Sequence, residues 1–143
     1  MKNNSALFYT CALIEYIGRQ QKKKRKDVVT ELGVKCIQRI YSHADVLHCE
    51  PIEKVADEFV SICDIGMGSF DNVAQCRYRV PDYWTIGEVY QRLIEDVADS
   101  DMIETLQKVY SSWISDAISN YNSDFYYQSR EYIRECYREG KVL

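Results

Sequence analysis

The sequence predicts an all-α fold, a single compact bundle of six to seven helices with an irregular loop near residues 64–80. Apolar residues recur every three or four positions along most of the chain, which is the spacing of an amphipathic helix. Glycine and proline are scarce, at 6 and 2 of 143 residues, whereas a β-sandwich or barrel needs frequent turns. The composition, with 46% hydrophobic and 28% charged residues, is typical of a globular domain. We therefore expect one helical domain over residues 1–143, with a helical half on either side of the loop (5–63 and 81–143).

The N-terminal half contains three helical stretches. The first covers residues 5–20, and Gly18 with the basic run that follows is expected to end or fray it. Residues 27–48 are expected to form two helices that meet at Gly33, because glycine is the usual residue just beyond a helix end and the apolar stripe changes phase there. The third stretch, 51–63, starts at a proline, which is well tolerated at the first helical position.

The loop separates these helices from the C-terminal half. Polar and apolar residues alternate over 76–80, which leaves a short strand there as an alternative to loop, but an alternation of five residues is weak evidence for a strand. The helix that follows is expected to begin at Thr85, because Thr85 and Glu88 have the spacing of a capping box, in which each side chain satisfies a free backbone N–H.

Two further helices complete the C-terminal half. The wide apolar band over residues 101–120 predicts one long central helix that contacts neighbours on two sides. A turn over 120–124 leads into the last helix, 124–139. In this helix arginine and glutamate each recur every four residues, so Glu131 can pair with Arg134 and Glu135 with Arg138, three positions further on. Gly140 is expected to end that helix.

Charge is distributed unevenly along the chain. The net charge is −4, yet six basic residues fall within eight positions without an acidic one: Arg19, Lys22, Lys23, Lys24, Arg25 and Lys26. Such a run is either a solvated connector or a patch that contacts phosphates. The following segment, 27–43, resembles a helix-turn-helix with Gly33 at its bend, so a nucleic-acid-binding regulator is the alternative function.

The cysteines and histidines do not form a recognisable catalytic or metal motif. Six cysteines are widely spaced, without a close pair, and are expected to be reduced apolar side chains rather than a disulfide framework or a zinc site. His43, Asp45, His48 and Cys49 form the one local constellation; it is interpreted either as a metal or catalytic site or as a polar clasp at a helix end. On a helix the two imidazoles diverge, which favours the clasp. We therefore predict no enzyme activity, no cofactor, no metal ligand, no catalytic residue and no small-molecule substrate.

Aromatic residues suggest how the protein functions. The chain has 12 tyrosines against 4 phenylalanines, and five of these tyrosines crowd the last 25 or so positions together with Phe125. Tyrosine and tryptophan are enriched at protein–protein contacts, although small bundles also use tyrosine at the edge of the core. The candidates for a protein-interaction surface are Trp84, Tyr126, Tyr127 and Tyr132.

The chain contains no apolar window long enough to span a bilayer, and Glu15 interrupts the apolar stretch near the N-terminus, which also lacks a cleavage site. We expect a cytoplasmic protein with no membrane partner.

Residues 8–60 resemble a family of short uncharacterised bacterial helical proteins, a domain of unknown function. Its pattern is matched by Phe8-Tyr9, Cys11 and Ile14, then by Asp27-Val28-Val29 and Leu32-Gly33-Val34, and finally by Ile40-Tyr41, Leu47-His48, Ile52 and Val55. The family has a tyrosine three residues before its Leu-His pair, where this chain has Ala44. Some members are encoded beside ADP-ribosyltransferase-like proteins, so the resemblance implies an antitoxin-like or regulatory partner protein. Our leading hypothesis is a non-enzymatic helical protein that binds another protein or itself.

Overall fold

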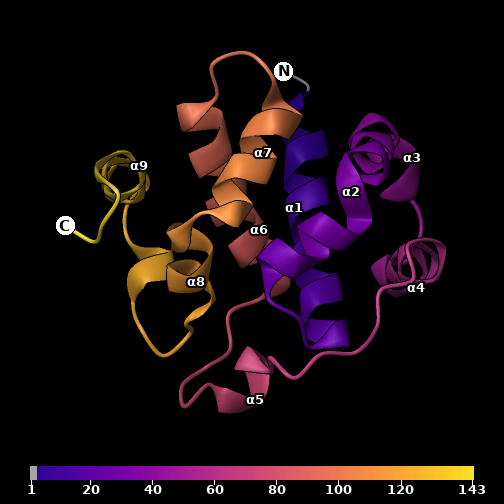
Figure 1. Ribbon diagram of the computed structural model, residues 1–143, viewed down its shortest axis with the longest axis horizontal. Helices are drawn as coiled ribbons and strands as arrows, with labels where there is room; N and C mark the ends of the chain where they lie inside the picture. The colour runs from indigo at the N-terminus through magenta and orange to yellow at the C-terminus, as the bar shows by residue number, and fades with distance from the viewer. Residues whose placement is uncertain (1–2) are drawn as a thin grey trace.

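The computed structural model describes residues 3–143, and the part that it describes is helical throughout, without a strand. Figure 1 shows the arrangement: α1 and α6 lie in the centre, α9 lies at one end of the long axis, and α3 and α4 lie at the other. Between residues 3 and 143 there are nine α-helices and one 3-10 helix, so the prediction of an all-α fold is confirmed and the predicted number of six to seven helices is too low. The α-helices are α1 (Asn3–Gln21), α2 (Arg25–Ser42), α3 (Ala44–Leu47), α4 (Ile52–Ile62), α5 (Asn72–Gln75), α6 (Tyr83–Val97), α7 (Met102–Ser111), α8 (Trp113–Ser119) and α9 (Arg130–Glu139), and the 3-10 helix η1 is Phe125–Tyr127.

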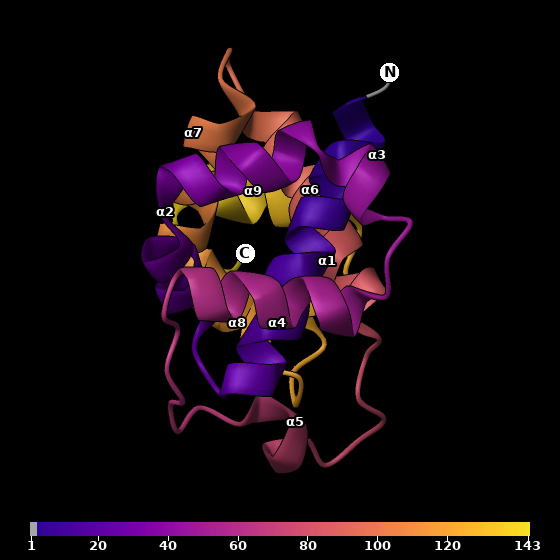
Figure 2. The ribbon, with the colours of Figure 1, turned by 90° about the vertical axis from the view of Figure 1, so that its right-hand side faces the viewer.

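The core forms where α1 packs between α2 and α6. Buried side chains of α1, such as Leu13, Ile14 and Ile17, contact those of α6 and the neighbouring helices in one continuous apolar cluster. Gly87 allows the closest approach, since a Cβ atom there would lie 2.8 Å from the backbone nitrogen of Ala12. Figure 2 shows α2 and α4 crossing α1 on one side of the molecule, so that α1 is covered on both sides.

Gly33 divides α2 as expected. Its backbone lies at φ 80° and ψ 163°, which is non-helical and which residues with a Cβ rarely adopt, so two helical arms meet there. Gly18, in contrast, does not itself end α1, although the helix does end close to the predicted residue 20, directly before Lys22 of the basic run. The helix continues to Gln21, and the space left by the absent side chain of Gly18 is filled by the side chain of Arg25.

The central segment is mostly irregular, as predicted, but the alternative strand is absent and the start of the next helix differs from the prediction. The structure has no strand over 76–80; residues 72–75 form the short helix α5 instead, and Asp71 caps it by accepting a hydrogen bond from the backbone N–H of Ala74 (3.0 Å). The predicted capping box is also wrong. Asp82 lies at the position before the first turn of α6, and its carboxylate accepts from the N–H of Trp84 (2.7 Å), so the capping residue lies three positions earlier than expected.

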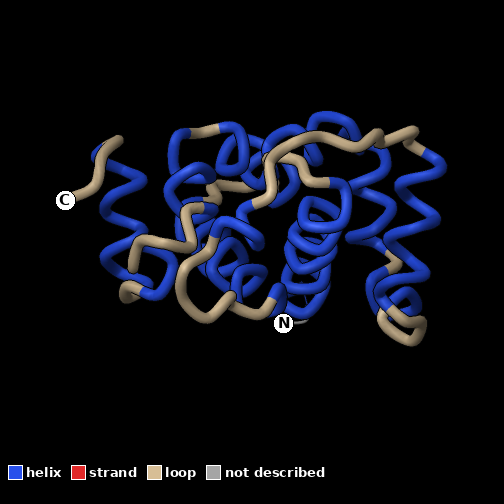
Figure 3. Tube along the Cα trace, turned by 90° about the horizontal axis from the view of Figure 1, so that it is seen from below, coloured by secondary structure: helices blue, strands red, loops and turns tan. Residues whose placement is uncertain are grey.

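The two C-terminal helices also differ from their predicted extents. The stretch 101–120 breaks into α7 and α8 at Ser112, whose extended backbone and hydroxyl cap the second helix. The last α-helix begins at Arg130, after the 3-10 turn, because Ser129 caps it there. Gly140 ends it in the left-handed conformation (φ 77°), as predicted. In Figure 3 this helix and the C-terminus lie at one end of the molecule.

Candidate functional site

An open groove lined by aromatic side chains is the most distinctive concavity of the described chain. We call it the aromatic groove; its volume is about 550 Å³. It lies between the start of α1, the end of α2, α3 and the start of α6. Its lining consists of Ser5, Ala6, Phe8, Tyr9, Tyr41, Ser42, Ala44, Asp45, His48 and Trp84.

The rings of the groove are held by contacts with one another. The ring centroid of Trp84 lies 5.3 Å from that of Phe8, 6.3 Å from that of Tyr9 and 6.3 Å from that of His48. The angles between these ring planes range from 42° to 72°, which are favourable tilted and edge-on arrangements. Tyr9 is almost fully buried, and burial raises the pKa of its phenol to about 12. The groove therefore has a rigid aromatic floor.

Two hydrogen bonds and one ring–ring contact position the start of α6, which carries Trp84. Asp82 fixes the first turn of α6, and the preceding residue, Pro81, offers its carbonyl oxygen to the guanidinium of Arg19 (2.7 Å). Tyr16 packs edge-on against Tyr83, with their centroids 5.2 Å apart. These contacts attach the start of α6 to α1, and thereby fix the side of the groove that carries Trp84.

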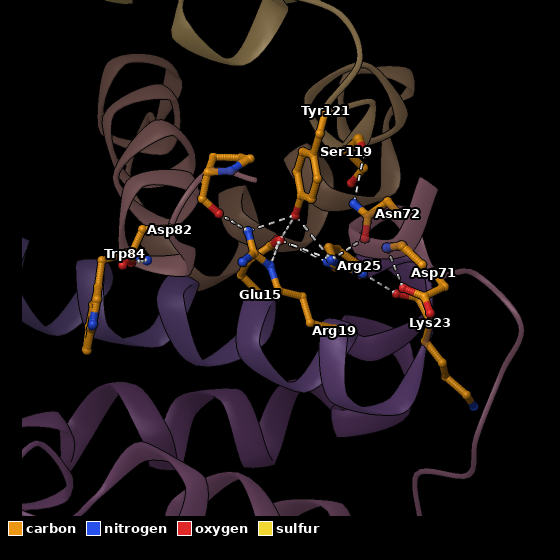
Figure 4. A network of polar contacts seen from close by, with 12 residues as sticks. Glu15, Arg19, Lys23, Arg25, Asp71, Asn72, Asp82, Trp84, Ser119 and Tyr121 are labelled. Carbon is orange, nitrogen blue, oxygen red and sulfur yellow. Dashed lines mark hydrogen bonds and ion pairs between the residues drawn. The ribbon is translucent and has the colours of Figure 1, made fainter. Parts of the chain in front are cut away.

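Arg19 belongs to a buried polar network that holds four segments together. The network is formed by Glu15, Arg19, Arg25, Asn72, Ser119 and Tyr121 (Figure 4). The guanidinium of Arg25 donates to both carboxylate oxygens of Glu15 (2.9 and 3.0 Å), to Lys23 O (2.6 Å), to Asn72 Oδ1 (3.0 Å) and to Tyr121 Oη (3.3 Å). The Tyr121 hydroxyl also donates to Glu15, and Asn72 donates to the carbonyl of Ser119 (2.9 Å).

The protonation of the network is fixed by its charges. Burial alone would raise the pKa of Glu15, but the positive charges of Arg25 and Arg19, with their hydrogen bonds, lower it below its usual value. Burial first, and then the negative charge of Glu15, raises the pKa of Tyr121 to about 12. Glu15 and Arg25 are only 1% exposed, and their hydrogen bonds are made to each other and to their neighbours. We call this buried network the clasp, because it joins α1, α2, α5 and the segment after α8; it is separate from the polar contact predicted at the helix end near His48.

This clasp uses much of the predicted basic patch. Arg25 and Arg19 pair with Glu15 inside it. Each of the next three lysines lies within 4 Å of a carboxylate: Lys22 near Asp71 (3.8 Å), Lys23 near Glu31 (2.6 Å) and Lys24 near Asp116 (3.9 Å). Lys26 is half-buried. Five of the six basic side chains would have to leave an internal partner before they could contact a phosphate.

The constellation around α3 is divided between two surfaces. His48 and Asp45 line the aromatic groove, while His43 lines a separate groove between α3 and α4 and bonds through Nδ1 to the carbonyl of Arg39 (2.9 Å). The thiol of Cys49 is exposed and lies 3.6 Å from the carbonyl oxygen of Asp45. Within residues 3–143, no three His, Cys, Asp or Glu side chains come together as a metal site would require. The structure places these residues around α3 without bringing them to one centre.

The cysteines do not all serve the core. Cys11 and Cys136 are fully buried, as apolar side chains would be. Cys36 and Cys63 are half-buried, and their sulfur atoms lie 3.1 Å apart, so the expectation of separate core positions is wrong for this pair. Their separation of 27 residues in the sequence gave no sign of the contact.

The four predicted interaction residues lie on three different surfaces. Trp84 belongs to the aromatic groove. Tyr126 and Tyr127 border a smaller groove between α6 and α9, where Tyr127 is 67% exposed. Tyr132 lies against Phe125 beside a third groove, with its centroid 6.4 Å away. Only Trp84 is part of a large aromatic cluster with polar groups.

Sequence reasoning missed most of the groove and the centre of the clasp. Phe8, Tyr9 and Tyr41 resemble ordinary core-edge residues in the sequence, since the groove exists only where α1, α2, α3 and α6 meet. Glu15 had a usable signal: a carboxylate within an apolar helical stripe needs a buried partner.

Comparison with protein-family models, with curated proteins and with solved structures finds no match to this chain. The resemblance of residues 8–60 to a bacterial family therefore stays a prediction. In the described part of the chain, no helix has the length and apolarity to cross a membrane.

Proposed function

We propose that the protein is a non-enzymatic, cytoplasmic helical protein that acts by binding another protein, and that the partner docks in the aromatic groove. The observation that carries this proposal is the groove itself: aromatic side chains from α1, α2 and α6 line one open cavity of about 550 Å³. Concave sites of this size, with mostly apolar walls and a few polar groups, are the usual form of a binding site. Tryptophan and tyrosine also dominate the energetics of protein interfaces.

The rigidity of the groove supports the same proposal. Its rings are carried by helices and pack on one another, so little side-chain entropy is lost when a partner docks. The most strongly perturbed buried groups, in contrast, are enclosed in the clasp and the core rather than exposed in a cleft. The wide spacing of the six cysteines in the sequence, without a close pair, supports a cytoplasmic location. The family resemblance implies a regulatory or antitoxin-like role for this protein.

Site-specific photo-crosslinking in the native host tests the proposal. A benzophenone amino acid in place of Ser42, at the rim of the groove, should give a discrete covalent adduct. The same group in place of Ser111, which is exposed at the end of α7, should give none. An adduct of twice the chain's mass identifies a second copy as the partner, whereas another mass identifies a different protein. Adducts from Ser111 but not from Ser42 would contradict the proposal.

The second candidate is nucleic-acid binding through the second arm of α2. Beyond the break at Gly33, this arm exposes Lys35, Gln38 and Arg39 in succession. Phosphate contacts by this arm predict salt-sensitive DNA or RNA binding that is lost in the Lys35→Ala/Arg39→Ala variant. A wild-type protein that binds neither nucleic acid at low salt contradicts it.

A further inference from the structure

The aromatic groove combines exposed ring surface with one carboxylate. Phe8 and Trp84 both line the groove and are partly exposed, and their rings lie 5.3 Å apart with planes tilted by 42° rather than stacked. Ring faces carry partial negative charge and attract cations, tryptophan most strongly. The cation–π contacts recorded within the described residues lie elsewhere, with Arg19 over Tyr121 and both Lys24 and Arg25 over Phe70.

Asp45 adds a full negative charge to the same wall. One of its oxygens accepts a hydrogen bond from the backbone N–H of Val46 (3.0 Å). Many exposed carboxylates of the chain have a lysine or arginine nearby, but among residues 3–143 no salt bridge involves Asp45. It is also the one anionic side chain in the described lining of the groove.

These two features select the charge of the occupant. An acidic group would be repelled by Asp45 and by the ring faces. A purely apolar side chain would cover the rings but would also remove water from the unpaired carboxylate, which costs free energy. A cation can form an ion pair with the carboxylate of Asp45 and a cation–π contact with the aromatic rings. We infer that the groove seats a lysine or arginine side chain of a basic segment of the partner protein, with its charge between Asp45 and the rings of Trp84 and Phe8.

The size of the groove fits a side chain with its flanking backbone. A volume of about 550 Å³ is within the range of sites that take small ligands, and exceeds what one methylene chain needs. The hydroxyl groups of Ser5 and Ser42 lie at its rim, where they can bond to a peptide backbone. The inference rests on the proposed function, because it names the chemistry of the partner's anchor at the same site.

Blocked tripeptides test the inference directly. Acetyl-Gly-Lys-Gly-amide, its arginine counterpart, the neutral norleucine isostere and the glutamate peptide are each titrated into ¹⁵N-labelled full-length protein. The lysine or the arginine peptide should shift the amide signals of residues 41–48 and 84, and should bind at least about fivefold more tightly than norleucine. The glutamate peptide should leave these signals unchanged.

Matched variants separate charge from shape. Asp45→Asn keeps the side chain's size and its acceptor for Val46 and should weaken the basic peptide about fivefold. Asp99→Asn, which changes an equally exposed carboxylate in the turn before α7, should have no effect. Norleucine binding as tightly as both basic peptides, or equal affinities for the two variants, would overturn the cation inference. The groove would still be the docking site if crosslinking from Ser42 succeeds, so the two failures are distinguishable.

Discussion

Replacing Gly18 by alanine should destabilise the protein, although the same change in an ordinary helix is stabilising. Alanine is favoured over glycine in a helix interior by about 1 kcal/mol. At Gly18, however, a Cβ atom would lie 2.3 Å from Cδ and 2.6 Å from Nε of Arg25, closer than real Cβ contacts. The Arg25 side chain cannot move aside freely, because its guanidinium donates five hydrogen bonds in the clasp.

The magnitude follows from what the displaced guanidinium leaves behind. Separating the Glu15–Arg25 pair leaves a buried carboxylate with a lost partner, which costs about 3–5 kcal/mol. After subtraction of the helix-propensity gain, we expect Gly18→Ala to lower the free energy of unfolding by about 2–4 kcal/mol.

Urea denaturation followed by circular dichroism measures this change as a shift of the midpoint. Gly66→Ala is the matched control, because a Cβ at that exposed loop position meets nothing within 4 Å, and its midpoint should be nearly unchanged. In a Glu15→Gln/Arg25→Ala background, where the obstructing side chain is absent, Gly18→Ala should instead stabilise by about 1 kcal/mol. A stabilising effect in the wild-type background would refute the steric argument.

Three further predictions concern stability and the cysteine pair. Gly87→Ala should destabilise by about 1–3 kcal/mol in the same urea assay, because its Cβ would meet backbone atoms of Ala12 at 2.8 and 2.9 Å; an unchanged midpoint would contradict the close packing of α1 on α6. The lowered pKa of Glu15 stabilises the fold above pH about 4.3, and this contribution is lost as the pH falls through the folded-state pKa. On acidification, the urea midpoint of Glu15→Gln should therefore fall less steeply than that of the wild type. Parallel curves for the two proteins would argue against the clasp. A small-molecule disulfide should oxidise Cys36 and Cys63 to an intramolecular disulfide and release two equivalents of the small thiol. The rate should rise with pH, because burial raises the pKa of Cys63 to about 12. Mass spectrometry should show the loss of two hydrogens, and oxidation only of exposed Cys49 would count against the pairing.

Periodicity predicted the class of the fold because most helices bury one stripe. Breaks in that period are where prediction and structure separate. Ser112 interrupts the stretch 101–120 without any glycine or proline, and its effect depends on a hydroxyl that caps the next helix. Asp82 caps α6 in place of Thr85, and the carbonyl of the preceding residue, Pro81, accepts a hydrogen bond from Arg19, which is 62 positions away in the sequence. Such choices are made by contacts distant in sequence.

The glycines have two different roles that the local sequence does not separate. Gly33 and Gly140 have positive φ angles and mark real interruptions, as the sequence predicts. Gly18 lies inside a continuous helix, and its role is to leave room for a side chain seven residues ahead. Local sequence cannot distinguish these roles, since both produce a glycine at the edge of an apolar stripe.

The candidate site was predictable only in part. Trp84 was singled out for its residue type, and it does lie in the groove. The sequence allows two interpretations of the basic run, a solvated connector or a patch that contacts phosphates. In the structure five of these side chains lie within 4 Å of the carboxylates of Glu15, Glu31, Asp71 and Asp116, and Arg25 is buried. Composition and local charge patterns do not show which carboxylates these basic side chains will contact in the folded chain.

The most direct test of the central claim is the affinity of the crosslinked partner for groove variants, measured by calorimetric titration with the purified proteins. The account predicts that Asp45→Asn weakens binding about fivefold and that Asp99→Asn leaves it unchanged. Equal affinities of both variants and the wild type would contradict recognition of a cation in the aromatic groove.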